Sequence, residues 1–195
     1  MTVTIVEDSP LRLAEYATVP IRFAVAEVFD DRALALLARG GDAVATRVAT
    51  PYPKDYDAHP GNRPTDWPNR FDVSAWTILA ASVNGQRVGG AVVIHGDPQI
   101  DLLRDCPDCA LLWDLRVEPE WRAQGVGSAL LHAVEDVARD REMRSISVET
   151  QQVNVPACRF YARHGFKLER VVPDAYRDLP QEIQLLWRKT LSGDS

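Results

Sequence analysis

Apolar and polar positions alternate along the chain in short runs, a pattern typical of strands and helices that each bury one face. Val3–Val6 predicts a short strand, and Ile21–Phe29 predicts another, because its apolar residues recur at every second position. Asp31–Arg39 predicts a short helix with Asp30 or Asp31 as its N-cap. The first third of the chain therefore mixes strand and helix.

The middle of the chain predicts a β-hairpin. Trp76–Val83 and Val88–His95 are apolar runs that flank Asn84 and Gly85. Asn-Gly between two apolar runs is the strongest short-range signal for two antiparallel strands. The stretch after them, Gly96–Asp108, is polar and is expected to be irregular.

The second half continues to alternate strand-like and helix-like segments. Expected strands are Ala110–Val117, Met143–Thr150, Lys167–Val172 and Glu182–Thr190, and expected helices lie within Arg122–Arg139 and Asn154–His164. This alternation predicts a single domain over residues 1–195 with a mixed sheet flanked by helices, in the α/β class (α+β in some schemes).

Residues 51–70 interrupt the pattern. They contain Pro51, Pro53, Pro60, Pro64 and Pro68, interleaved with Tyr52, Tyr56, His59 and Trp67. Because proline breaks regular elements, we expect a proline-rich loop at about 51–70. A loop of this length is often a functional lid or substrate wall, but a well-packed surface excursion fits equally well.

Composition and charge narrow the function classes. The chain has 195 residues, 46% of them hydrophobic, and a formal net charge of −6. No apolar run is long enough to span a bilayer, and Met1–Pro10 lacks a signal-peptide pattern, so we expect a cytoplasmic protein. The negative charge argues against nucleic acid or an anionic membrane as partner. The negative charge suits a cationic substrate. The alternative is that it serves only to keep the protein soluble.

The three cysteines do not indicate a metal site. Cys106 and Cys109 form a lone CxxC without the two further ligands that zinc needs, and without the strand–helix setting of a redox motif. We therefore expect no metal, two thiols in a polar loop, and a small helical residue at Cys158.

A glycine-containing turn between a strand and a helix predicts an anion site. Gly125 and Gly127 remove two side chains where the backbone bends, so that successive N–H groups can converge on an anion. The following helix adds its unpaired N–H groups and positive dipole end, and Arg122 adds a full charge. The motif is neither a Walker A loop nor a dinucleotide fingerprint, since the residues those motifs require are missing.

A second polar group gathers at the next strand–helix junction. Asn154 is a favoured N-cap, and Tyr161 lies close to two turns further along the same helix face. Glu149 leaves the preceding strand on its polar side. A carboxylate, an amide and a phenol thus come together. The alternative is that Asn154 is only a helix cap and Tyr161 only an aromatic residue of the core.

These two segments carry a resemblance to a known family. Arg122-Ala-Gln-Gly125-Val-Gly127 resembles the acetyl-CoA signature of the GNAT superfamily of N-acetyltransferases, and Val148–Phe166 is similar to its second cofactor motif. Within the superfamily the chain looks most like streptothricin-type acetyltransferases. The features that carry this closer likeness are Glu149-Thr150-Gln151, Asn154-Val155, Ala157-Cys158-Arg159-Phe160-Tyr161 and the stretch Glu182–Trp187.

The resemblance implies a fold and a cofactor site. The fold would be a twisted, mostly antiparallel sheet of about seven strands, splayed between Leu111–Val117 and Arg144–Thr150. The pantetheine arm of acetyl-CoA would insert there, along the backbone of Leu115, Arg116 and Val117, with Asn154 beside it. The pyrophosphate would meet the turn whose residues are Arg122, Ala123, Gln124, Gly125, Val126, Gly127 and Ser128.

The expected reaction is direct attack of a small primary amine on the thioester. Glu149 is the first candidate for the base that deprotonates the amine, directly or through a water, and Asp114 is the second, unless it pairs with an arginine. A backbone N–H near Val117 would stabilise the oxyanion, and Tyr161 would protonate the departing thiolate. Cys158 lacks a neighbouring histidine base, which argues against an acyl-enzyme.

Two alternatives remain at this stage. Besides the enzyme described above, the chain could be a non-catalytic module that senses acyl-CoA. A protein N-terminal or lysine acetyltransferase is a third reading, which an enclosed site would disfavour. Dimerisation is common in the superfamily, but the sequence does not show it, nor does it restrict the donor to acetyl.

Overall fold

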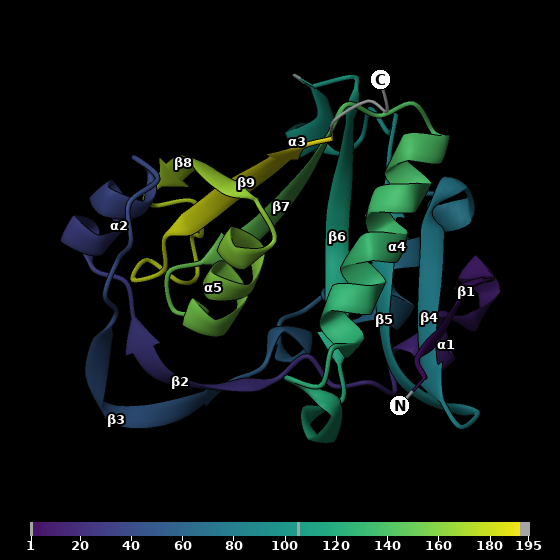
Figure 1. Ribbon diagram of the computed structural model, residues 1–195, viewed down its shortest axis with the longest axis horizontal. Helices are drawn as coiled ribbons and strands as arrows, with labels where there is room; N and C mark the ends of the chain where they lie inside the picture. The colour runs from purple at the N-terminus through teal and green to yellow at the C-terminus, as the bar shows by residue number, and fades with distance from the viewer. Residues whose placement is uncertain (1, 105, 192–195) are drawn as a thin grey trace. The chain divides into compact units, whose positions relative to one another are not determined.

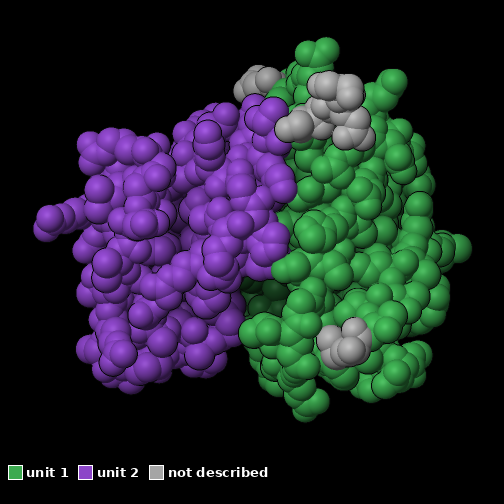
Figure 2. All heavy atoms as spheres, in the orientation of Figure 1, with its two compact units in different colours: residues 1–22, 55–146, 191–195 green, residues 23–54, 147–190 purple. Residues whose placement is uncertain are grey.

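The computed structural model describes residues 2–104 and 106–191, so Met1 and Ser195, the ends of the expected domain, lie outside the described residues. Seven strands form a mixed sheet in the order β1-β4-β5-β6-β7-β9-β8, and β2 and β3 form a separate pair (Figure 1). The chain divides into two compact units, one made of residues 1–22, 55–146 and 191–195 and the other of residues 23–54 and 147–190 (Figure 2). The expected mixed sheet with flanking helices is confirmed.

The first unit holds the larger part of the sheet. Its elements are β1 (Thr4–Asp8), η1 (Pro10–Arg12), α1 (Leu13–Tyr16), η2 (Tyr56–Ala58), η3 (Pro64–Asn69), η4 (Val73–Ala75), β4 (Thr77–Val83), β5 (Gln86–Ile94), α3 (Asp101–Arg104), β6 (Cys109–Val117), η5 (Pro119–Trp121) and α4 (Val126–Asp140). Strands β1, β4, β5 and β6 are antiparallel neighbours. The predicted hairpin is confirmed: Asn84 (φ 51°) and Gly85 (φ 79°) adopt the left-handed conformations of a type I′ turn.

Strand β5 is packed tightly on both faces because two glycines lie side by side in it. A Cβ atom at Gly89 would meet Val126 and Leu130 of α4, whereas one at Gly90 would lie 2.5 Å from the Tyr16 ring. Successive residues of a strand point to opposite faces. Helix α4 therefore covers one face of this unit's sheet, and α1 contributes Tyr16 to the other.

The second unit holds β2 (Phe23–Val28), α2 (Asp31–Leu37), β3 (Thr46–Lys54), α5 (Val155–Arg163), β8 (Lys167–Val172), β9 (Gln184–Thr190) and most of β7 (Ser145–Gln151). Helix α2 begins as predicted, with the Asp30 carboxylate accepting a hydrogen bond from the Ala33 N–H. In the described residues, no helix combines the length and the apolarity that a membrane crossing requires.

The prediction of a loop over 51–70 is wrong at its start. Pro51 and Pro53 lie in β3, where Pro53 is opposite Ala24 of β2. Each strand of a two-stranded pair keeps one outer edge, where a missing N–H costs no ladder bond, so proline is tolerated. The rest of the segment is also ordered: η3 buries Trp67 to 2% exposure among aromatic rings.

The stretch Gly96–Asp108, expected to be irregular, includes α3 and contributes to the core. Ile100, Leu103 and Cys106 are buried against the aromatic cluster of the first unit. A helix of four residues is too short to show a repeat of apolar positions, so the sequence pattern does not predict it.

Candidate functional site

The turn before α4 adopts the backbone that its glycine predicts. Gly125 is the N-cap of the helix with φ 89°, and Ala123 also has a positive φ of 58°. Ala123, Gln124 and Gly125 are exposed, whereas Val126 is buried and fixes the start of the helix. Alternating left-handed residues turn successive N–H groups toward one side, which is the geometry of an anion-binding nest.

The first turn of α4 has no side-chain cap, in contrast to the first turns of α2 and α5. Asp30 caps α2 and Asn154 caps α5, each by accepting a backbone N–H of the first turn. A glycine N-cap has no side-chain oxygen, and the first N–H groups of any helix have no acceptor within the helix itself. An external anion is the natural acceptor for these groups, and the helix dipole favours its charge.

Arg122 is held against the end of β6. Its Nε donates to the carbonyl oxygen of Val117 at 2.9 Å, which ties the turn to the strand. Burial lowers the pKa of Arg122, but an arginine keeps its charge at neutral pH. The turn thus combines backbone donors, a helix N-terminus and a fixed cation.

Strand β6 is kinked just before the residues expected to bind the pantetheine arm. Leu115 and Val117 pair regularly with Ala91 and Gly89 of β5, but Trp113 is the extra residue of a bulge. Bulges bend a strand and often lie beside active sites. The backbone roles of Leu115, Arg116 and Val117 stay predictions.

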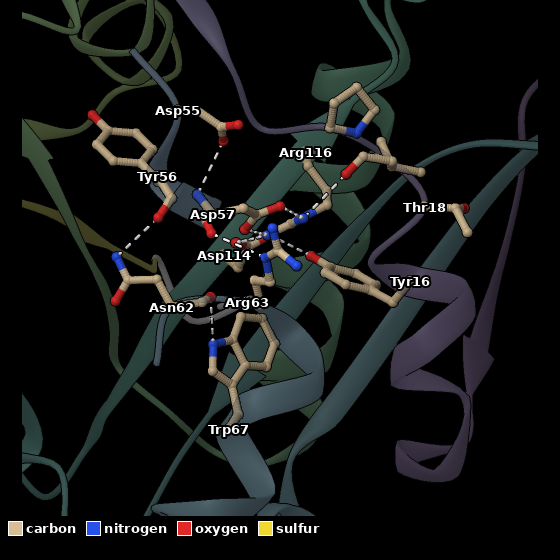
Figure 3. A network of polar contacts seen from close by, with 12 residues as sticks. Tyr16, Thr18, Asp55, Tyr56, Asp57, Asn62, Arg63, Trp67, Asp114 and Arg116 are labelled. Atoms are coloured by element: carbon tan, nitrogen blue, oxygen red, sulfur yellow. Dashed lines mark hydrogen bonds and ion pairs between the residues drawn. The ribbon is translucent and has the colours of Figure 1, made fainter. Parts of the chain in front are cut away.

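The Arg116 side chain lies at the centre of a buried polar network (Figure 3). Its guanidinium donates to Asp114 through Nε and Nη2, at 2.9 and 2.8 Å, and to the Asp57 carboxylate. The Tyr16 hydroxyl donates to Asp114 at 2.5 Å. Asp114 is therefore engaged as an ion-pair partner, the alternative that the sequence left open, and its role as a base stays a prediction with less support than that of Glu149.

Glu149 lies in the second unit with both carboxylate oxygens engaged. Oε1 accepts from the Tyr176 hydroxyl at 2.6 Å and from Gln151, and Oε2 accepts from Gln184 Nε2 at 2.7 Å. Burial raises the pKa of Glu149, while the hydrogen bonds from Tyr176 and Gln184 lower it in part. A carboxylate with a raised pKa is a stronger base than an ordinary one.

Asn154 and Tyr161 lie on α5, also in the second unit. The Asn154 side chain accepts the Ala157 N–H at 3.2 Å, so its predicted capping role is confirmed. Tyr161 is 6% exposed, and its ring packs against Phe160 and Phe166. Its role as general acid stays a prediction.

The cysteines lie in packed surroundings. Burial raises the pKa of Cys158 to about 12, so its thiol is protonated at neutral pH and is a poor nucleophile. Cys106 and Cys109 are buried rather than placed in a polar loop, and Cys109 opens β6. Between residues 2 and 191, apart from residue 105, no group of histidine, cysteine and acidic side chains is arranged to hold a metal ion.

The sequence does not predict four residues of these networks: Tyr16, Asp57, Tyr176 and Gln184. Tyr176 lies between β8 and β9, 27 residues after Glu149, and no local periodicity connects the two. Asp57 lies in η2, 59 residues before Arg116. A buried arginine in a strand demands carboxylate partners, which is a signal that such partners exist but not where they lie.

The chain is similar to known acetyltransferases over most of its length. The model of the Acetyltransferase (GNAT) family matches residues 42–166. Streptothricin acetyltransferase A of Bacillus subtilis is 38% identical over 80 residues, which cover 40% of this chain and 46% of that protein. Streptothricin acetyltransferase of Escherichia coli is 29% identical over 181 residues, which cover 91% of each chain. The chain thus spans about half of the first relative and nearly all of the second.

Solved structures show the same fold. Nourseothricin acetyltransferase superposes with a TM-score of 0.73 at 21% identity, covering 98% of this chain and 100% of that one. A Bacillus anthracis protein crystallised in complex with acetyl coenzyme A gives a TM-score of 0.74 at 22% identity, with the same coverage.

Proposed function

Because the chain belongs to the Acetyltransferase (GNAT) family, we propose that it transfers an acetyl group from acetyl-CoA to a primary amine of a small cationic acceptor of the streptothricin kind. The observation that carries the choice of acceptor is the similarity to the Escherichia coli streptothricin acetyltransferase over 91% of both chains. That similarity extends beyond the cofactor motifs into the first half of the chain. The net charge of −6 suits a cationic acceptor.

The turn at 122–128 has the chemistry that a pyrophosphate needs. Backbone N–H groups from Gln124 onward would donate to the phosphate oxygens, and Arg122 would add its charge. Gly125 allows the close approach because it has no side chain and adopts φ 89°. Acetyl-CoA supplies a thioester whose carbonyl carbon accepts the amine.

Glu149 would prepare the amine, because most amines are protonated at neutral pH and cannot attack. Its carboxylate would accept the amine proton, directly or through a water, and burial makes it a better proton acceptor. Asp114 is less suited, since it pairs with the charged guanidinium of Arg116, whereas the donors to Glu149 are neutral.

Tyr161 would return a proton when the thiolate of CoA departs. Its hydroxyl is the acid, and its packed ring restricts where that hydroxyl can lie. Cys158 takes no part, because its protonated thiol does not form an acyl-enzyme. The reaction needs acetyl-CoA, which is abundant in the cytoplasm, and we propose that location for the protein.

A thiol-release assay tests the proposal. Purified protein with acetyl-CoA is offered streptothricin, an aminoglycoside, a polyamine and a peptide with a free N-terminus, and products are checked by mass spectrometry for one added acetyl group. We expect streptothricin to be acetylated with the highest kcat/KM. Tight binding of acetyl-CoA in calorimetry without thiol release on any amine would instead favour the sensor. Preference for the peptide would favour a protein acetyltransferase.

A further inference from the structure

The Glu149 carboxylate is held by neutral donors from three parts of the second unit. The Tyr176 hydroxyl comes from the segment between β8 and β9, Gln184 begins β9, and Gln151 ends β7. Tyr176 and Gln151 engage Oε1 and Gln184 engages Oε2, so the carboxylate is held at both of its oxygens. This arrangement brings together residues that are 35 positions apart in the chain.

The other buried carboxylates of the described residues are held differently. Asp8 pairs with Arg87, Glu182 with Lys54, Asp114 with Arg116, and Glu135 with Arg139. Across residues 2–104 and 106–191, Glu149 has no such lysine or arginine partner, and Tyr176 is the titratable side chain that contacts it. A cation would lock a carboxylate in its charged form and weaken it as a base, whereas neutral donors orient it and leave it able to accept a proton.

The direction of the Tyr176 hydroxyl is determined by a second hydrogen bond. Gln151 Nε2 donates to the Tyr176 oxygen at 2.7 Å. An amide nitrogen only donates, so the single hydrogen of the tyrosine hydroxyl is committed to Glu149 Oε1, 2.6 Å away. The donor to Glu149 is therefore itself held in place.

We propose that Tyr176 and Gln184 are positioning residues, which fix the Glu149 carboxylate so that it can take the proton of the acceptor amine. The inference rests on the proposed function, since it assigns Glu149 as the base. Tyr176 and Gln184 act through Glu149 and touch neither the donor nor the acceptor in this role.

The pH dependence of turnover distinguishes positioning from a structural role. Both hydrogen bonds stabilise the ionised form of Glu149, so their loss raises its pKa and moves the acid limb of kcat/KM to higher pH. For Tyr176→Phe with streptothricin we expect kcat/KM to fall by on the order of tenfold on the acid limb and by less than about threefold on the alkaline plateau. Affinity for acetyl-CoA should not change.

Gln184→Glu gives a second, larger shift in the same direction, because it places a second carboxylate in the position of the amide, against Glu149 Oε2. It keeps the inference testable if Tyr176→Phe folds poorly. Tyr52→Phe is the matched control: it also removes one tyrosine hydroxyl from the second unit, but its side chain is 41% exposed on β3. Its pH profile should follow that of the parent.

Carbon-13 NMR of the side-chain carboxyl, assigned with Glu149→Gln, follows the titration of Glu149 without any turnover. An upward shift of that titration in Tyr176→Phe and Gln184→Glu supports the inference. An unshifted titration, or an equal loss of kcat/KM at every pH, overturns it. The proposed function fails separately, if the parent does not acetylate streptothricin or if Glu149→Gln acetylates it at the parent rate.

Discussion

The guanidinium of Arg116 forks onto the carboxylate of Asp57, with its two terminal nitrogens 3.0 and 3.3 Å from the two oxygens. The same group pairs with Asp114 and donates to the Val19 carbonyl oxygen, so all five of its N–H donors are engaged. Burial opposes the charge of Arg116, but Asp114, Tyr16 and Asp57 together outweigh that effect, and the pKa of the arginine is raised. One cation thus fastens η2 and the N-terminal segment to β6 of the first unit (Figure 3).

Arg116→Met should destabilise the protein by about 3–5 kcal/mol, because it leaves the Asp114 carboxylate buried without its cation. Urea denaturation measures the free energy of unfolding. The double variant Arg116→Met/Asp114→Asn should recover part of the loss, since it removes the uncompensated charge. Arg104→Ala, which breaks an exposed pair with Asp101, is the control and should change little. An additive double variant would contradict the explanation.

Gly125→Ala should weaken acetyl-CoA binding. A side chain at φ 89° is strained by about 1–2 kcal/mol, and relief of that strain would turn the N–H groups of the nest away from the pyrophosphate. Gly40→Ala is a matched control, because Gly40 also has a positive φ of 74° and open space around its Cβ position. Calorimetry should show a raised Kd for acetyl-CoA with Gly125→Ala alone. If the two variants bound acetyl-CoA with equal affinity, the turn would not be the site that binds the coenzyme.

Tyr161→Phe should lower kcat by about 10²–10⁴, the usual cost of losing a general acid or base. Acetyl-CoA affinity and thermal stability should stay close to those of the parent, because phenylalanine keeps the ring contacts with Phe160 and Phe166. Steady-state kinetics together with calorimetry separate these effects. Acetylation at the parent rate would remove Tyr161 from the mechanism.

Glu149→Gln should abolish most activity and make the stability of the fold less dependent on pH. The pKa of Glu149 is raised in the folded state, so folding favours the protonated form. Its contribution to stability is complete below the unfolded pKa of about 4.3 and is lost as pH rises through the folded pKa. The melting temperature of the variant relative to the parent should therefore rise between pH 4 and pH 7. A difference that stays constant over this range would contradict this assignment.

The sequence predicts elements well where local chemistry decides them. Asn84-Gly85 predicts the hairpin because only residues that tolerate a positive φ form its turn. Asp30 and Asn154 predict helix starts because a short polar side chain satisfies the first-turn N–H groups, and both do so. Gly125 predicts the left-handed backbone of the turn before α4 for the same kind of local reason.

Local sequence patterns do not predict which residues the tertiary fold brings together. Pro51 and Pro53 argue for a loop by local rules, and only the pairing of β3 with β2 as an isolated two-stranded ribbon makes them tolerable in a strand. The sequence shows that Glu149 is a polar residue at the end of a strand. Its donors Tyr176 and Gln184 come close to it only because of the path that the chain takes between β8 and β9. Asp114 reads as a base or an ion-pair partner until the buried Arg116 beside it is seen.

The order of synthesis has a consequence for β2 and β3, which belong to a unit whose remaining residues, 147–190, leave the ribosome only after residues 55–146 of the other unit. The ribbon must wait for its packing partners while the residues of the other unit are still being made. During that interval an unprotected strand edge invites pairing with other nascent chains. Pro51 and Pro53 lack the backbone N–H that such a neighbour would need, which disfavours pairing along this strand while the protein is unfinished.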